Sequence, residues 1–185
     1  MFGTGRALLW FSAVLLVNWL YNFGPRLSSN LAPLDVICPC GYLLVVPLSS
    51  WLNGLPDPPL RSWAHAGVLV LRTQLWLQTF DADADADADR RTSAVLLGVR
   101  RAQTALAALL AAETALVFCA FENWPLRSFS AISMALLVAQ ALPARSPPVK
   151  ATISRTGVYA VFVLLGLGGL GLMVRVWLDG TFLRA

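Results

Sequence analysis

The stretch WAHAGVLVLRTQLWLQTF, residues 63–80, runs directly into DADADADADRRT, residues 81–92, and this junction decides how the chain folds. The first part is a mostly apolar run, and the second is polar and contains five aspartates. A helix of about 18 or more mostly apolar residues is long enough to cross the hydrocarbon core of a bilayer, roughly 30 Å. The junction therefore predicts a transmembrane helix whose end lies at a membrane surface.

Apolar runs of similar length recur along the chain. Of its 185 residues, 57% are hydrophobic and only 13% are charged, whereas soluble domains carry about a quarter charged residues. None of the runs alternates as a strand of a membrane barrel would, so we expect helices. We predict an all-α integral membrane helical bundle, a single membrane domain over residues 1–185. Its six expected spans are approximately 7–23, 34–53, 63–80, 97–121, 128–143 and 155–178.

The distribution of charged and cysteine residues excludes several classes of protein. The formal net charge is +4, but the basic residues lie between the apolar runs and form no single stripe, which argues against nucleic-acid binding. Cys38, Cys40 and Cys119 lie within apolar runs without the spacing of a zinc site. We therefore expect neither a disulfide nor zinc.

Basic residues also predict the orientation of the bundle in the membrane. If six spans alternate, the loops that carry most of the arginine and lysine lie on one side, around residues 26, 90–101 and 145–155. The positive-inside rule places these loops in the cytoplasm, together with the aspartate-rich segment at 81–92. Both termini are then expected on the opposite side.

The aspartate-rich segment is the one feature that does not resemble membrane scaffolding. Five carboxylates within nine residues repel one another unless solvent or a cation offsets their charge. One interpretation is a solvated, low-complexity cytoplasmic loop over residues 81–92. The other is a metal site, because Asp81, Asp85 and Asp89 are spaced by four and would share a face if the preceding helix continued. Such carboxylates suit Mg²⁺, which keeps positions open for water and phosphate oxygens.

Three arginines are candidate catalytic residues. Arg90 and Arg91 follow the acidic run, and guanidinium groups suit bidentate phosphate binding, although a basic flank is also usual at the cytoplasmic end of a helix. Arg72 lies inside the expected span 63–80, where an arginine normally faces the bundle interior. Contact with a diphosphate or an acceptor, and a structural ion pair, both remain open for Arg72.

The segment from Leu71 to Gly98 resembles the second aspartate-rich motif of the UbiA prenyltransferase superfamily. That motif reads roughly D-x3-D-x3-G-x2-T followed by a small and apolar stretch that leads to a glycine, and Asp81, Asp85 and Thr92 match it. On this resemblance Asp81 and Asp85 form the metal-binding pair, and Asp83 and Asp87 have no role. A weaker similarity, over residues 20–51, is to the loop between the family's fourth and fifth helices and the helix after it.

The resemblance implies a Mg²⁺-dependent intramembrane prenyltransferase, with the six spans equivalent to the family's helices four to nine. An isoprenyl group would pass from an isoprenyl diphosphate to an acceptor that the sequence does not identify. The chain departs from the motif at Asp89, where the family has glycine. We identify no counterpart of the family's first motif, N/D-x3-D, before Asp81, so we expect the chain to be inactive alone.

Two alternatives to a prenyltransferase remain open. A UbiA-type terpene cyclase would use the same acidic motif without an acceptor, and a non-catalytic truncated homologue would bind lipid or a partner protein. For the enzyme, a second chain or a homo-oligomer would have to complete the site. The lipid bilayer is the expected surrounding in every case.

Overall fold

The computed structural model describes residues 4–22, 32–44, 47, 50, 56–141 and the single positions 163, 167, 168 and 171. Within these residues every element is a helix, which confirms the all-α prediction for this part of the chain. In chain order the elements are α1 (Thr4–Asn22), α2 (Leu34–Ile37), the 3-10 helix η1 (Cys38–Leu44), α4 (Leu60–Asp87), α5 (Ser93–Leu97), α6 (Val99–Ala120) and α7 (Trp124–Ala141).

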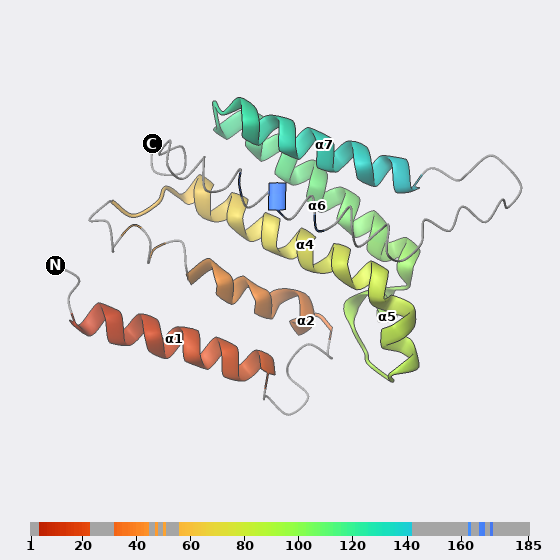
Figure 1. Ribbon diagram of the computed structural model, residues 1–185, viewed down its shortest axis with the longest axis horizontal. Helices are drawn as coiled ribbons and strands as arrows, with labels where there is room; N and C mark the ends of the chain where they lie inside the picture. Colours follow the sequence, from red (N-terminus) through yellow and green to blue (C-terminus); the bar gives the residue numbers. More distant parts are fainter. Residues whose placement is uncertain are drawn as a thin grey trace, which may run out of the picture.

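The long helices lie side by side in an order that follows the chain (Figure 1). α1 packs against η1, η1 against α4, α4 against α6, and α6 against α7. The short helix α5 lies at the end of the bundle, where α4 ends and α6 begins, and it contacts both. The centre of the described structure is therefore the pair α4 and α6.

Helix α6 shows why these two helices pack together. Its buried residues are spaced by four, four, three and four positions, which places them on one helix face. They are Ala102, Leu106, Leu110, Glu113 and Val117. The apolar members of this face join Leu75, Trp76, Ala82 and Ala94 in the core or extend it toward the C-terminal end of the helix.

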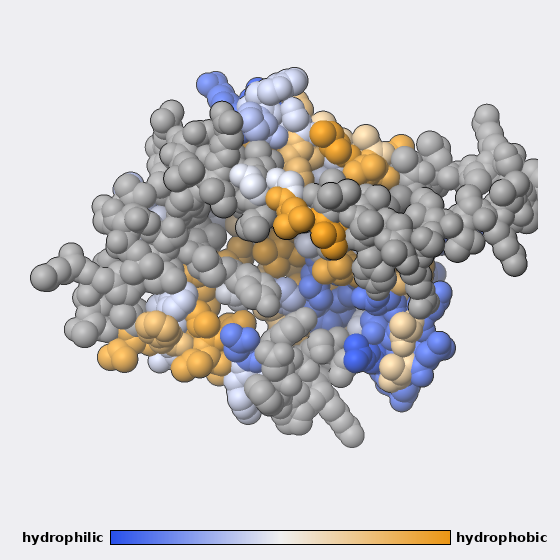
Figure 2. Space-filling view, viewed as in Figure 1, coloured by the Kyte–Doolittle hydropathy of each residue, from blue (hydrophilic) through white to orange (hydrophobic). Residues whose placement is uncertain are grey.

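The membrane prediction is supported by one helix of the described part. Helix α6, 22 residues from Val99 to Ala120, is long and apolar enough to cross a membrane. Large apolar side chains are also exposed on α1, and Figure 2 shows hydrophobic residues gathered over that helix. Leu8, Leu9, Phe11, Leu15, Leu16 and Trp19 are the exposed ones. The number of membrane spans and their orientation are not determined by the described helices and stay predictions.

The structure corrects three of the expected element bounds. The expected span 34–53 begins as four residues of α-helix followed by a 3-10 helix that contains Pro39. Proline lacks the N–H that an α-helix requires, so a continuous helix is disfavoured there. The expected span 97–121 corresponds to α6, which begins two residues later, at Val99, because Gly98 with a φ of 76° separates it from α5. The acidic segment 81–92 is helical as far as Asp87 and is a loop only beyond it.

The expected span 7–23 corresponds to α1, Thr4–Asn22, and the last two expected spans have different outcomes. Helix α7 begins at Trp124, four residues before the expected start at 128. The Asn123 side chain explains this start, because its Oδ1 accepts the N–H of Leu126 at 3.0 Å and so caps the helix. The expected span 155–178 lies outside the described residues, apart from the isolated positions given above.

A close approach joins α1 to η1. Trp10 Nε1 donates to the carbonyl of Leu44 at 2.7 Å, and Gly41 faces Val17 so closely that a Cβ at residue 41 would lie 2.0 Å from Val17 Cγ1. Small residues allow backbones to approach one another in membrane bundles. Gly41 is therefore required by packing.

We predict that Gly41→Ala lowers the free energy of unfolding by about 1–3 kcal/mol, as overpacking does. The additional substitution Val17→Ala should recover most of this loss, because it removes the methyl group that clashes. Gly67→Ala is the control, since its Cβ would meet nothing nearer than Leu43 Cδ1 at 3.9 Å. Thermal unfolding in detergent measures all three, and an equal loss from Gly41→Ala and Gly67→Ala would contradict the packing argument.

Candidate functional site

The acidic end of α4 brings two of the expected metal ligands onto one helix face. Asp81 and Asp85 lie one turn apart within the helix. Asp85 is 8% exposed and Asp81 is half-buried, whereas Asp83 and Asp87 are exposed. The alternation therefore divides the aspartates into an inner pair and an outer pair, as the helical interpretation requires.

Asp89 does not extend this face, which corrects the expectation that Asp81, Asp85 and Asp89 share it. The helix ends at Asp87, and Asp89 adopts a φ of 53°. Asp89 N–H donates to Ala86 O at 3.1 Å, and Arg90 N–H donates to Asp85 O at 2.9 Å. These two bonds form the Schellman motif that ends many helices, and its left-handed residue is usually glycine. The position is the one at which the resembled motif has glycine.

The turn after α4 folds back onto Asp85. Arg90 Nη1 and Thr92 Oγ1 each lie 3.3 Å from an oxygen of the Asp85 carboxylate. The Arg90 side chain is 53% exposed, so this ion pair is formed at the surface. Arg91 is also exposed, and within the described residues no salt bridge joins it to a carboxylate. The structure thus brings Asp85 and Arg90 together and leaves Arg91 facing outward.

A second buried carboxylate, Asp35, ties the start of α2 to α5. It accepts Ser93 N–H at 2.5 Å and Ser93 Oγ–H at 2.7 Å, and its side chain is fully buried. It also accepts the N–H of Val36 at 3.0 Å. Sequence reasoning assigned no role to Asp35. The sequence did offer a signal for it. Asp35 lies inside an apolar run, and burying a carboxylate there costs free energy unless hydrogen-bond donors surround it.

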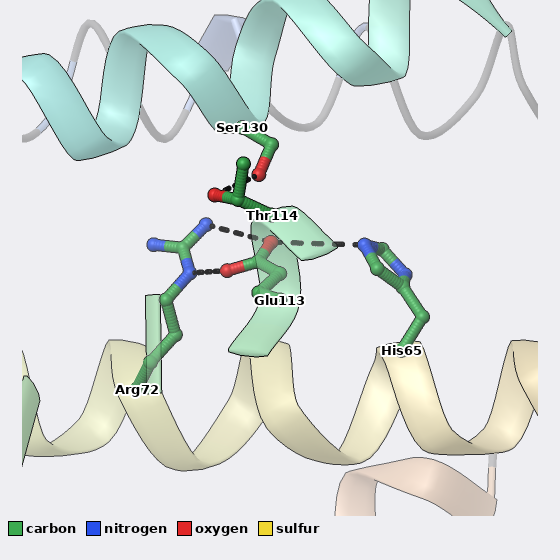
Figure 3. A network of polar contacts seen from close by, with 5 residues as sticks. All are labelled: His65, Arg72, Glu113, Thr114 and Ser130. Carbon is green, nitrogen blue, oxygen red and sulfur yellow. Dashed lines mark hydrogen bonds and ion pairs between the residues drawn. The ribbon is translucent and has the colours of Figure 1, made fainter. Parts of the chain in front are cut away.

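Arg72 belongs to a separate polar cluster between α4 and α6 (Figure 3). Its guanidinium forms a two-point ion pair with Glu113, through Nε to Oε2 and through Nη2 to Oε1, the latter at 3.3 Å. His65 Nε2 lies 3.6 Å from Glu113 Oε1. All three side chains are at most 5% exposed. Beside them, Thr114 and Ser130 share a hydrogen bond of 2.9 Å that joins α6 to α7.

The position of Arg72 along α4 separates it from the acidic end. Asp81 is nine residues further on and Asp85 thirteen, which corresponds to about 14 and about 20 Å along a helix. The sequence left open a contact with diphosphate or acceptor and a structural ion pair. In the structure Arg72 forms the ion pair, with Glu113. Sequence reasoning missed Glu113, although an isolated acid within the apolar run 97–121 is the partner that a buried arginine requires.

The acidic end can supply part of a magnesium site. Asp81 and Asp85 offer the hard oxygen ligands that Mg²⁺ prefers, and Mg²⁺ commonly binds through one or two carboxylates together with phosphate oxygens and water. Among the described residues no group of three or more His, Cys, Asp or Glu side chains could hold a metal ion. The donor chemistry therefore fits Mg²⁺, but the described protein ligands amount to one side of a site.

The letters N-x3-D do occur before Asp81, at residues 53–57. Asp57 precedes Leu60, the first residue of α4, whereas Asp81 lies near the end of that helix. The 21 positions from Leu60 to Asp81 correspond to about 32 Å along the helix. Asp57 therefore cannot act together with Asp81 and Asp85 on one ligand within the chain.

Comparison of the chain with protein-family models, curated proteins and solved structures found no match.

We predict that Arg72→Leu and Glu113→Leu each lower the free energy of unfolding by about 3–5 kcal/mol, because each leaves a buried charge without its main partner. The double substitution Arg72→Leu/Glu113→Leu should be much less harmful, since it removes both charges together. A double-mutant cycle from unfolding in detergent measures the coupling. Additive losses in the double variant would contradict the ion-pair account.

Proposed function

We propose that the chain is a UbiA-like intramembrane prenyltransferase, or the C-terminal part of one. The observation that carries the proposal is the pair Asp81 and Asp85, one turn apart near the end of α4 and followed by an arginine that contacts Asp85. Two further features support it: the left-handed turn at Asp89, where the resembled motif has glycine, and the membrane-spanning length of α6. The cytoplasmic location of this end, with both termini outside, belongs to the same proposal.

The proposed site binds an isoprenyl diphosphate from the acidic end of α4. Asp81 and Asp85 would hold Mg²⁺, which when bound offsets the negative charge of the diphosphate leaving group. Arg90 and Arg91, which follow the acidic run, would contact phosphate oxygens on the same side of the ligand. Because Arg90 contacts Asp85 at 3.3 Å, its guanidinium is already positioned beside the proposed metal ligands. The prenyl chain would extend from this end toward the apolar interior, where an acceptor takes the allylic group.

A non-catalytic role is the second candidate, and one observation favours it. Both oxygens of the Asp85 carboxylate have partners within the chain, Arg90 and Thr92. A carboxylate satisfied in this way stabilises the turn without a metal. In that case the chain would bind lipid or a partner protein, and Asp85 would act as a structural residue.

Binding measurements on single aspartate variants separate these roles. We predict that Asp81→Ala and Asp85→Ala each abolish Mg²⁺-dependent binding of inorganic diphosphate, whereas Asp83→Ala and Asp87→Ala do much less because these side chains are exposed. Each variant removes one negative charge, so the outer pair is a matched control for the inner pair. Isothermal titration calorimetry with and without Mg²⁺ measures the effect. Equal losses at all four positions would mean that only the total charge matters.

We further predict that the purified 185-residue chain alone forms no prenylated product. The reason is that one acidic motif holds the diphosphate from one side only, and ionisation depends on a preorganised, enclosed site. Supplying three further helices with an N/D-x3-D loop, fused or as a second chain, should restore turnover. Product formation by the chain alone, lost on Asp81→Ala, would contradict this prediction. Product formed from the prenyl diphosphate without any acceptor would identify a cyclase instead.

A further inference from the structure

The junction between α5 and α6 carries a surface that the proposed reaction does not use. Arg100 and Arg101 occupy the first turn of α6 and are exposed. Immediately before them, Leu96 and Leu97 are 58% and 44% exposed. Two exposed large apolar side chains and two exposed guanidinium groups therefore lie within six residues of the chain.

The arginines of this surface form no salt bridge with any described residue. The first turn of α6 contains no acidic residue. The positive end of the helix dipole adds to their charge. The exposed acidic residues of the described part are Asp57, Asp83, Asp87, Asp89 and Glu122, and none of them forms a salt bridge with Arg100 or Arg101. An external anion would stabilise this arrangement.

The position of the surface on α6 indicates which anion it meets. Arg100 and Arg101 are at the beginning of the helix that is long and apolar enough to cross a membrane. The beginning of such a helix lies at the boundary between hydrocarbon and headgroups. At this depth exposed leucines enter the acyl region, while arginines reach phosphates through their long side chains.

Gly98 separates the two leucines, on α5, from the two arginines, on α6. It is exposed and adopts a φ of 76°, so the chain turns between α5 and α6 at this residue. A glycine accommodates this conformation without steric cost. The leucines of α5 consequently lie on a separate short helix at the end of the bundle beside α6 (Figure 1).

We propose that Leu96, Leu97, Arg100 and Arg101 form a binding site for the headgroup of an anionic phospholipid. The phosphate of the lipid binds to Arg100 and Arg101, and its acyl chains cover Leu96 and Leu97. The site is independent of the proposed prenyl transfer, because it uses none of the residues assigned to that reaction.

Native mass spectrometry tests this site on the full chain, purified with an equal mixture of phosphatidylglycerol and phosphatidylcholine. The wild-type chain should retain phosphatidylglycerol selectively. Arg100→Gln/Arg101→Gln should lower this selectivity about ten- to thirtyfold, because an arginine near an anionic surface contributes roughly 1 kcal/mol. Arg100→Lys/Arg101→Lys should largely keep it. Leu96→Gln/Leu97→Gln should weaken retention of both lipids.

Two controls make the outcome decisive. Arg61→Gln/Arg127→Gln removes the same charge near the opposite ends of α4 and α6 and should leave the selectivity unchanged. Excess inorganic diphosphate should not displace the lipid, and displacement would assign the arginines to a soluble phosphate ligand and overturn the proposal. Equal retention of the two lipids by the wild-type chain, or unchanged selectivity in Arg100→Gln/Arg101→Gln, would also overturn it. If Arg100→Gln/Arg101→Gln does not fold, the wild-type chain is measured at high salt instead. Its selectivity for phosphatidylglycerol must then be lost, because salt screens the charges of the arginines.

Discussion

The ion pair between Arg72 and Glu113 is the interaction on which the described bundle depends. A charge buried among apolar helices is costly unless a partner of opposite charge lies beside it, and these two residues lie on different helices. Their pairing fixes the rotation of α4 and α6 about their axes. The same rotation directs Ala102, Leu106 and Leu110 of α6 toward Leu75 and Trp76 of α4. It also sets which aspartates of α4 face inward at the helix end.

Two further buried carboxylates stabilise the acidic end of the bundle through hydrogen bonds. Asp85 and Asp35 are both buried, and they bind the neighbouring residues Thr92 and Ser93. The backbone N–H of Ala32 adds a hydrogen bond of 3.1 Å to the carbonyl of Arg91. The turn that carries Arg90 and Arg91 is therefore held from α4 on one side and from the start of α2 on the other. These bonds fix the backbone of the turn from which Arg90 and Arg91 extend.

The main helices could be predicted from the sequence, whereas their exact ends and the partners of their buried charges could not. Long apolar runs predicted α1, α4, α6 and α7 because burial and length dominate there. The continuation of α4 to Asp87 was left between two interpretations, since alanine favours a helix and repelling aspartates oppose it. Asp89 was misplaced because the helix end depends on local backbone bonds. Glu113 and Asp35 were missed because an ion pair or a cap between distant segments is a property of the packed chain.

Electron paramagnetic resonance of Mn²⁺, used in place of Mg²⁺, tests the central claim most directly. The claim is that the acidic end of α4 holds a divalent cation together with a diphosphate, and that Asp85 therefore does more than stabilise a turn. With a non-reactive isoprenyl diphosphate analogue, we expect protein-bound Mn²⁺ with hyperfine coupling to phosphorus, dependent on Asp81 and Asp85. Absence of bound Mn²⁺, or binding that is the same in Asp81→Ala and Asp85→Ala, would contradict the account.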